Sequence, residues 1–394
     1  MAWSVDVPGE GSSTPIIWED RLFLITAVET EKKSEKQLDF HPETRTRPTG
    51  NVFDFIVICY NRNTGKEVWK KVVASAAPHE GRHSSTTYAS ASPMTDGKHL
   101  YVSFGSYGIF CMTLDGKVVW ERDLGDMRTR RGWGEAVSPV VHDEKVIVMW
   151  DQEEQSEIFV LNTSDGKTAW SEKRDEPTTW ATPLVVNRNN KTQIVTSGTN
   201  KVRSYDLESG KINWESDGLT LNAIPCPLMD GDNLICMSGY RGNAAYSINL
   251  AQFDPKDGNE PNEANEAKMN WRFNHDTPYV PSPLLTGGRL YFTKSLNAIL
   301  TCLDSKTGEP IIKPTRLPNL RGLYASPVAS RQHIYVPSRE GATLVLENSP
   351  EFKVVGTNQL DSSIDASPAI VGDSIYIRTR KKLCLLYTSD AADE

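Results

Sequence analysis

The sequence predicts an all-β fold: an eight-bladed β-propeller made of four-stranded antiparallel blades. Two recurring elements predict it. The first is a hairpin in which an apolar strand leads through a polar turn ending in Gly-Lys to a strand that closes on Trp, as in Ile158 to Trp170. The second is a small or hydroxyl residue followed by Pro and a short apolar strand. Self-similarity at a fixed period indicates a repeat architecture, because each repeat packs only on its neighbours.

The hairpin element repeats along the chain, and its Trp has a predicted structural role. A Trp three residues after Gly-Lys occurs at Trp69, Trp120, Trp170 and Trp214. A large flat indole can bury both of its faces, so we expect docking between neighbouring blades; the alternative is that each Trp fills the core of its own hairpin. The predicted docking residues are Trp3, Trp69, Trp120, Trp170, Trp214 and Trp271.

The proline element sets the period. Proline is tolerated at the entry of a first strand, where the ladder does not yet need its missing donor. The spacing of the copies centres on about 44 residues, and a unit of that length with four short strands is a propeller blade. The eight copies contain Pro15, Pro93, Pro139, Pro183, Pro227, Pro283, Pro327 and Pro368.

The chain ends and two insertions complete the predicted domain, residues 1–383. Residues 29–51 and 254–268 are polar and aperiodic, so we expect surface loops. Trp3-Ser4-Val5 resembles the last strand of a blade, whereas the eighth blade ends before its fourth strand. The N-terminal strand should therefore complete the last blade and close the ring. Residues 384–394 stop matching the repeat and resemble a translated sequencing adaptor, so we predict a non-native tail.

Composition and charge exclude several classes of protein. The chain has 43 basic and 51 acidic residues, a net charge of −8, and its basic residues are scattered, which argues against a nucleic-acid partner. It has no apolar run of the roughly 18 residues that a transmembrane helix needs. The six cysteines form no Cys-x-x-Cys pair, so we expect no metal site. We expect a monomer.

The blade pattern resembles the pyrroloquinoline-quinone-like (PQQ-like) repeat. The pattern is small-Ser-Pro, an apolar strand, a polar turn, and Leu-Asp-x-x-Thr-Gly-Lys-x-x-Trp, which Leu303 to Gly308 and Tyr205 to Lys211 follow in part. The resemblance covers Trp3 to about Leu383. It implies the eight-bladed propeller shared by quinoprotein dehydrogenases and by BamB-like proteins of the outer-membrane β-barrel assembly machinery. Activity follows far less directly, because one fold hosts unrelated functions.

The same resemblance sets what an enzyme of this family would need. It implies a vicinal Cys-Cys over the quinone, a Trp beneath it, Ca²⁺ held by Glu and Asn, and an Asp base. Trp133 and Trp180 could pack beneath a cofactor, but the sequence has no Cys-Cys pair. It also lacks the Gly-x-Ser-x-Gly elbow that a hydrolase would need. We therefore predict no catalytic residue and no cofactor, and keep a PQQ- and calcium-dependent oxidoreductase as the alternative.

Loops that enter the innermost strands should converge at one mouth of a propeller, and several of them are rich in Arg and aromatic residues. Such side chains are typical anchors for a peptide or a carboxylate-bearing ligand; the alternative is that the arginines are solvated and the aromatics pack the loops. The predicted function is a non-catalytic binding or scaffold propeller with a protein or peptide partner. We expect it in the bacterial periplasm, or otherwise outside the cytoplasm, with the signal peptide upstream of Met1. The candidate ligand-binding residues are His83, Tyr88, Arg131, Trp133, Trp180 and Arg241.

Overall fold

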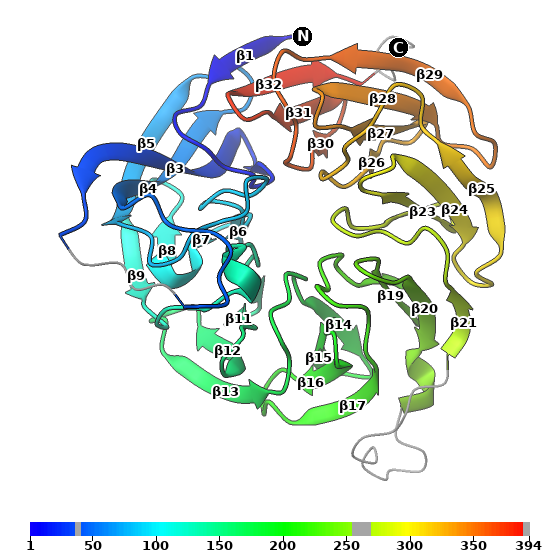
Figure 1. Ribbon diagram of the computed structural model, residues 1–394, viewed down its shortest axis with the longest axis horizontal. Coiled ribbons are helices and arrows are strands. Elements are labelled where there is room, and N and C mark those ends of the chain that lie inside the picture. Colours follow the sequence, from blue (N-terminus) through cyan, green and yellow to red (C-terminus); the bar gives the residue numbers. More distant parts are fainter. Residues whose placement is uncertain (36–40, 254–268, 389–394) are drawn as a thin grey trace. The chain divides into compact units, whose positions relative to one another are not determined.

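The computed structural model describes residues 1–35, 41–253 and 269–388. Within these ranges the regular structure is almost entirely β-strand, arranged in eight four-stranded antiparallel sheets (Figure 1). Each sheet carries one copy of the predicted repeat, so the predicted fold class, a β-propeller of eight four-stranded blades, is confirmed. The predicted insertion at residues 254–268, residues 36–40 of the predicted insertion 29–51, and residues 389–394 lie outside the described residues. Residues 29–33, predicted as part of a surface loop, continue a β-strand instead.

The chain divides into two compact units, of which the first contains residues 1–169 and 364–394. Its strands pair in chain order within each sheet, except that the N-terminal strand joins the last one. The sheets are β2 (Ile16–Trp18), β3 (Arg21–Lys33), β4 (Asn51–Asn61) and β5 (Glu67–Ala76); β6 (Met94–Thr95), β7 (His99–Ser103), β8 (Ile109–Thr113) and β9 (Val118–Arg122); β10 (Val140–His142), β11 (Lys145–Trp150), β12 (Ser156–Asn162) and β13 (Thr168–Arg174); and β30 (Ala369–Val371), β31 (Ser374–Arg378), β32 (Lys382–Tyr387) and β1 (Trp3–Asp6). Residues 170–174 of β13 belong to the second unit. Two short 3₁₀ helices, η1 (Gly105–Tyr107) and η2 (Arg130–Gly132), lie in loops of the first unit.

The second unit contains residues 170–363. Its strands follow the same order. They are β14 (Leu184–Arg188), β15 (Lys191–Thr196), β16 (Lys201–Asp206) and β17 (Ile212–Asp217); β18 (Leu228–Asp230), β19 (Asn233–Ser238), β20 (Ala244–Asn249) and β21 (Met269–Phe273); β22 (Leu284–Thr286), β23 (Arg289–Lys294), β24 (Ile299–Asp304) and β25 (Pro310–Arg316); and β26 (Val328–Ala329), β27 (His333–Pro337), β28 (Ala342–Glu347) and β29 (Val354–Gln359). The 3₁₀ helix η3 (Leu250–Phe253) follows β20.

The N-terminal strand completes the last sheet, as predicted. Strand β1 pairs with β32 in an antiparallel register that sets Trp3 opposite Leu385 and Val5 opposite Leu383. The paired strand β32 continues past Leu383, and Cys384 and Leu385 are buried. The first four residues of the predicted tail, 384–387, therefore form part of this sheet.

The cores lie between neighbouring sheets. Alternate residues of a strand point to opposite faces, so Phe55 and Val57 of β4 pack toward the second sheet, whereas Ile56 and Ile58 pack with residues of the last sheet. Cys59 lies in the first of these cores as a free, fully buried thiol, and burial raises its pKa to about 12. The Cys59 side chain therefore acts as a small apolar residue.

The repeated tryptophans connect one sheet to the turn of the next. In five of the six the indole N–H donates to a turn carbonyl, and the glycine of that turn lies under the ring, where a Cβ would come within 3 Å of it. Each of these glycines also has a positive φ, so two constraints require it. The donor and acceptor pairs are Trp3 and Arg62 (3.2 Å), Trp69 and Leu114 (2.9 Å), Trp120 and Thr163 (2.7 Å), Trp170 and Leu207 (2.7 Å), and Trp271 and Ser305 (2.9 Å).

Trp214 departs from this pattern because the sheet that follows it has no Gly-Lys turn. Its indole N–H donates to Gln193 at 3.3 Å, and its ring stacks on Phe253 of η3 with centroids 4.8 Å apart. The side chain is almost fully buried. The η3 helix thus takes the place that a turn glycine has elsewhere.

The hydroxyl residue that precedes most of the repeat prolines has a structural role that the sequence does not reveal. In the first unit the Thr14 N–H donates to Ser92 Oγ at 3.0 Å, and the Ser92 N–H donates to Ser138 Oγ at 2.8 Å. In the second unit Ser282 Oγ accepts from the Cys226 N–H at 3.0 Å, and the Ser282 N–H donates to Ser326 Oγ at 2.9 Å. The repeated hydroxyl therefore links the innermost strand entries of successive sheets and satisfies backbone donors there.

Candidate functional site

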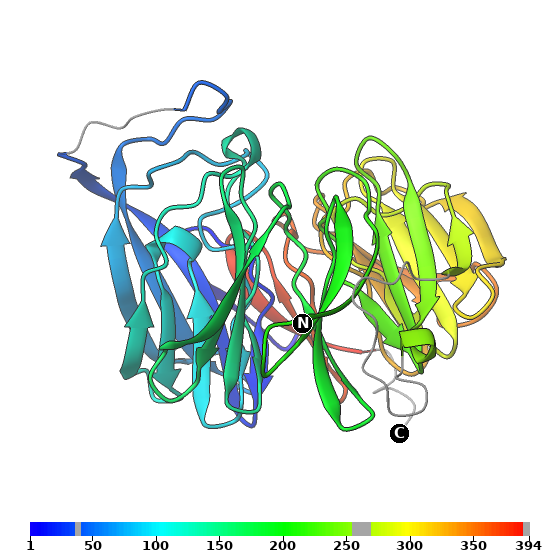
Figure 2. The same ribbon diagram turned by 90° about the horizontal axis from the view of Figure 1, so that it is seen from below.

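Three loops of the first unit pack together at one end of its sheets (Figure 2). They are the described parts of the β3–β4 loop (41–50), the β5–β6 loop (77–93) and the β9–β10 loop (123–139), and we call them the loop cluster. The Arg45 N–H donates to Arg131 O at 2.9 Å, Thr46 Oγ1 donates to Gly132 O, and the His83 N–H donates to Trp133 O at 3.1 Å. Backbone hydrogen bonds thus fix each loop against another.

The loop cluster brings together three of the six candidate residues. The Arg131 guanidinium lies 5.7 Å from the centroid of the Trp133 ring, and the His83 ring stands edge-on to the same indole at 6.1 Å. Arg131 has a φ of 56°, in the left-handed region that a residue with a side chain adopts only at a cost. Arg131 and Trp133 are half-buried, and His83 is exposed. The loops therefore present an Arg-aromatic group on a backbone held by its neighbours.

Tyr88, the fourth candidate, packs beneath the loops. Its hydroxyl donates to Glu80 O at 3.1 Å, its ring meets Phe53 edge-on at 5.1 Å, and the Arg82 guanidinium lies 5.3 Å from the ring centroid. Burial raises the pKa of its hydroxyl to about 12. These contacts support the loop from inside.

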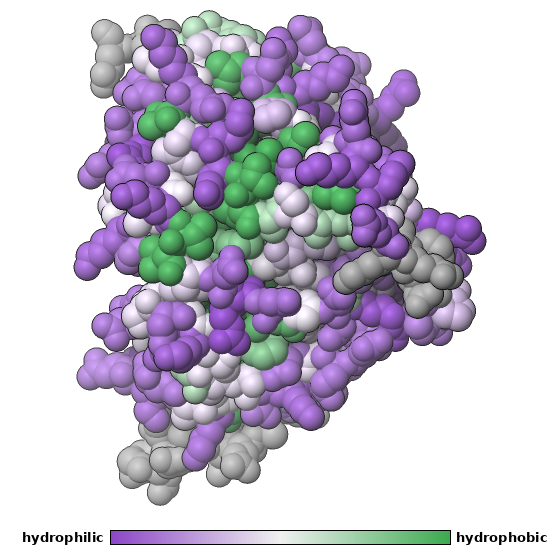
Figure 3. Space-filling view, turned by 90° about the vertical axis from the view of Figure 1, so that its left-hand side faces the viewer, coloured by the Kyte–Doolittle hydropathy of each residue, from purple (hydrophilic) through white to green (hydrophobic). Residues whose placement is uncertain are grey.

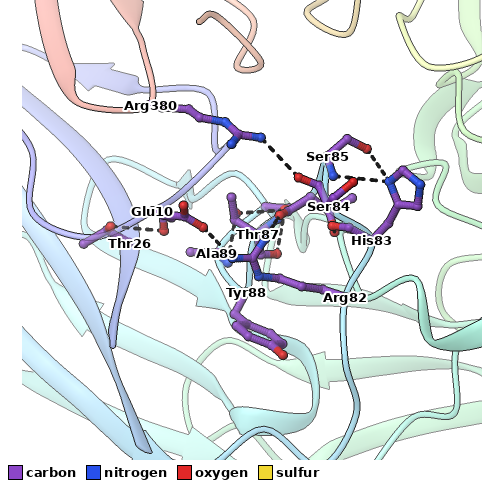
Figure 4. A network of polar contacts seen from close by, with 12 residues as sticks. Glu10, Thr26, Arg82, His83, Ser84, Ser85, Thr87, Tyr88, Ala89 and Arg380 are labelled. Carbon is purple, nitrogen blue, oxygen red and sulfur yellow. Dashed lines mark hydrogen bonds and ion pairs between the residues drawn. The ribbon is translucent and has the colours of Figure 1, made fainter. Parts of the chain in front are cut away.

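The β5–β6 loop is also tied to the N-terminal segment and to the last sheet (Figure 4). Arg82 forms an ion pair with Glu10 at 2.5 Å and donates to Thr86 O within its own loop. From the last sheet, Arg380 donates to Ser84 O at 3.4 Å. The loop that carries His83 is therefore anchored on both sides.

Two carboxylates that no sequence motif indicated hold the loop cluster from below. Glu80 is 8% exposed, and its Oε2 accepts from the Thr129 N–H at 3.1 Å and from Thr129 Oγ1 at 2.7 Å. The half-buried Glu135 accepts from the Ser106 N–H at 2.7 Å and from Ser106 Oγ at 2.6 Å. Desolvation raises the pKa of Glu80 and raises that of Glu135 to about 7. The hydrogen bonds from Thr129 and Ser106 act in the opposite direction and lower both pKa values, but desolvation is the larger effect.

The raised pKa of Glu135 predicts a pH-dependent contribution to stability. Its ordinary pKa is 4.5, so between pH 4.5 and about 7 the folded protein keeps a proton that the unfolded chain has lost. This contribution favours folding below pH 4.5 and declines as the pH rises toward 7. We expect Glu135→Gln to remove that decline, so its melting temperature relative to the parent should rise by a few degrees from pH 5 to pH 8.

Calorimetry from pH 5 to pH 8 tests this expectation, with the exposed Glu121→Gln as the control. The control should follow the parent at every pH. Parallel curves for Glu135→Gln and the parent would show that Glu135 does not titrate in this window.

The other two candidates lie in the second unit. Trp180 is half-buried, and its backbone N–H donates to Ala223 O at 2.8 Å. The exposed Arg241 has a positive φ, and its guanidinium lies 5.5 Å from the ring of Tyr240, which stacks on Tyr279 at 4.8 Å. That all six candidates face one mouth stays a prediction.

A buried ion-pair network fixes the loop that carries Trp180. Arg203 lies 2.9 Å from Glu176 and 2.5 Å from Glu215, and it also pairs with Asp175. The Glu176 side chain is fully buried and accepts the backbone N–H groups of Asn200 and Lys201 at 2.8 and 2.9 Å. The acidic residues before Trp180 are therefore structural.

A cavity of about 500 Å³ opens in the loop cluster, and all three loops line it together with Glu154. Arg128 on its wall lies 3.4 Å from Glu43 and 3.5 Å from Glu154, and donates to Glu153 O at 3.0 Å. These partners hold its charge in place. The described part of the β3–β4 insertion is thus a wall of the site, which its polar, aperiodic sequence did not indicate.

The chain lacks the vicinal Cys-Cys that the resemblance to quinoprotein dehydrogenases implies over a quinone. The six cysteines are free and none is adjacent to another in the sequence. In the described ranges, no group of three or more His, Cys, Asp or Glu side chains is placed to hold a metal ion. The Arg131 guanidinium and the His83 ring both lie near the Trp133 ring.

No helix among these described residues is suited to crossing a membrane.

Comparison with known structures places the fold among several functional classes. BamB from Moraxella catarrhalis superposes with a TM-score of 0.63 at 12% identity, over 92% of this chain and 99% of that one. A europium-containing methanol dehydrogenase gives 0.63 at 11% identity, over 95% and 84%. A quinohemoprotein alcohol dehydrogenase from Comamonas testosteroni gives 0.61 at 10% identity, over 98% and 75%. Identities this low establish the fold alone.

Sequence comparison is more specific. The outer membrane protein assembly factor BamB of Legionella pneumophila (strain Paris) is 26% identical over 189 residues, which are 45% of this chain and 44% of that protein. The match thus spans less than half the length of that relative. The family described as outer membrane protein assembly factor BamB matches residues 54–313 and 189–393. The chain therefore belongs to the BamB family of PQQ-like propellers.

Proposed function

We propose that this protein is a non-catalytic scaffold outside the cytoplasm that binds a protein partner through its loop cluster. The observation that carries the proposal is the Arg131–Trp133–His83 group on loops fixed by backbone hydrogen bonds and by buried Glu80. Membership of a family described as an outer membrane protein assembly factor supports the extracytoplasmic location and the protein partner.

The physical argument concerns preorganisation and side-chain type. Arg and Trp are the residues most enriched at binding hot spots, because they combine a large contact area with directional donors. Loops already ordered in the free protein lose little conformational entropy on binding. The planar Arg131 guanidinium favours a carboxylate or an aromatic ring of the partner. The preferred partner is therefore a folded or extended protein segment with acidic and aromatic side chains.

Charge reversal and truncation at this group should abolish binding without unfolding the protein. The double variant Arg131→Glu with Trp133→Ala should reduce recovery of outer-membrane assembly proteins by at least about tenfold in quantitative affinity purification from a bacterial envelope. Its melting temperature should stay within a few degrees of the parent, because both side chains are only half-buried.

A matched control changes charge and area at the other end of the same sheets. Trp18→Ala with Lys117→Glu removes one indole and reverses one charge, and both residues are exposed beside β-turns of the first unit. This control should bind as the parent does. If the parent and the loop-cluster variant recover the partner proteins equally, the proposed site is wrong. A redox chromophore that forms on adding PQQ and Ca²⁺ would favour the quinone-dependent oxidoreductase instead.

A further inference from the structure

A second cavity, separate from the Arg131–Trp133–His83 group, opens between the outer strands of the first two sheets. It has a volume of about 630 Å³. Its apolar wall comes from Val73, Ala74 and Ala76 of β5, together with Tyr107 of η1 and Phe110 of β8. Figure 3 looks at the side of the molecule that carries β5 and β9, where apolar side chains gather among charged ones.

The rim of this cavity carries an excess of negative charge. Glu121, Asp123 and Asp126 line it, against a single guanidinium, Arg122, that donates to Thr168 at 3.4 Å. Glu121 and Asp123 are exposed, and Asp126 is 69% exposed. Glu121 and Asp123 are therefore available to a cationic ligand, and beside them Asp126 lies 3.7 Å from His79 Nδ1 with most of its side chain exposed.

The cavity meets the loop-cluster cavity at His79 and Asp126, which line both. His79 Nε2 lies 2.9 Å from Met127 O, which only accepts, so Nε2 carries a proton, and Nδ1 lies 3.1 Å from the Tyr107 hydroxyl oxygen. The imidazole is thus held as part of the wall. Beyond it, the buried Glu80 Oε1 has no hydrogen-bond partner among the described residues. Two adjoining cavities of about 630 and 500 Å³ suit an elongated ligand.

Strand β5 adds backbone recognition. It is the outer strand of its sheet and pairs only with β4 in the described chain, so one edge has N–H and C=O groups without a strand partner. An extended peptide can pair with such an edge while alternate side chains enter an adjacent pocket.

We propose that this groove binds an extended polypeptide segment in which an apolar side chain is followed by Lys or Arg. The apolar side chain enters the cavity between β5 and β9, and the cationic group reaches the carboxylates near Asp126. Opposite charges attract the basic segment and disfavour an acidic one. This groove differs from the Arg131–Trp133–His83 group in its lining residues and in the charge of the ligand that it favours.

The test uses fluorescein-labelled synthetic peptides of equal length and fluorescence anisotropy with the intact protein. The peptides repeat Leu-Lys-Ser, Leu-Glu-Ser or Ser-Lys-Ser. We expect the Leu-Lys-Ser peptide to bind at least about tenfold more tightly than either other peptide, and its affinity to fall as salt is raised.

Two variants locate the binding. Glu121→Lys with Asp126→Lys reverses the rim charge at exposed positions, and Ala77→Trp fills the apolar cavity from its edge. Each variant should bind the Leu-Lys-Ser peptide at least about tenfold more weakly than the parent does. The control Glu144→Lys with Glu208→Lys makes the same charge change at exposed turn positions outside both cavities and should leave binding unchanged.

Three outcomes would overturn the proposal. They are equal affinity for the Leu-Lys-Ser and Leu-Glu-Ser peptides, no binding of the Leu-Lys-Ser peptide by a folded parent, and an equal loss in Arg131→Glu with Trp133→Ala. The last outcome assigns the peptide to the loop cluster. If the Arg131→Glu with Trp133→Ala variant loses partner recovery but still binds the Leu-Lys-Ser peptide, the result supports two separate binding sites.

Discussion

Replacing Trp271 with Ala is expected to lower the free energy of unfolding by about 3–5 kcal/mol. The side chain is 7% exposed and lies in a core with Phe292 and Leu303 of the next sheet. Its indole N–H donates to Ser305 O at 2.9 Å, and the ring covers Gly308. The substitution therefore leaves a cavity between two sheets and an unsatisfied carbonyl, and both costs add.

Urea denaturation followed by fluorescence and circular dichroism measures this loss. Leu296→Ala, in the same unit but 69% exposed, is the control and should cost less than about 0.5 kcal/mol. A loss below about 1 kcal/mol at Trp271 would mean that the indole does not dock the two sheets. Agreement of the two probes checks that unfolding is cooperative enough for a single free energy.

The sheets could be predicted from sequence because their signals are local and repeated. Each blade repeats Pro, an apolar strand and the Gly-Lys turn, so one interpretable copy, such as Ile158 to Trp170, predicts the others. The Trp3 strand could be assigned to the last sheet because the N-terminus begins with an isolated strand that resembles the fourth strand of a blade, whereas the eighth blade lacks a fourth strand of its own. Pairing of β1 with β32 bears this out.

The candidate site could be predicted only in part, because its geometry depends on contacts without a period. Charge and aromatic content indicated His83, Arg131 and Trp133, which the loops do bring together. Glu80 and Glu135 support those loops by two hydrogen bonds each, from Thr129 and from Ser106, which lie 49 and 29 positions away in the sequence. A lone Glu in a polar loop gives no signal that distinguishes such a buried support from a solvated charge.

Deleting residues 1–8 is expected to destabilise the first unit and to promote aggregation. Four residues of β1 pair with β32, the Ala2 N–H donates to Leu385 O at 2.8 Å, and the Val7 N–H donates to Lys381 O at 2.8 Å. The deletion exposes the edge of β32, and it also removes the Trp3 indole that covers Gly65. An unpaired apolar edge is a template for pairing with another chain, so larger oligomers or precipitate should replace the species that the full chain forms.

Size-exclusion chromatography and thermal melts of the truncated chain measure this effect, and a synthetic peptide of residues 1–8 added in trans provides the decisive control. If β32 needs a strand partner, the peptide should restore a large part of the lost melting temperature in proportion to its concentration, by mass action. A peptide with Val5→Pro should fail, because proline has no backbone N–H to donate to the ladder opposite Leu383. A truncated chain that elutes and melts as the full chain does would show that the last sheet is stable with three strands.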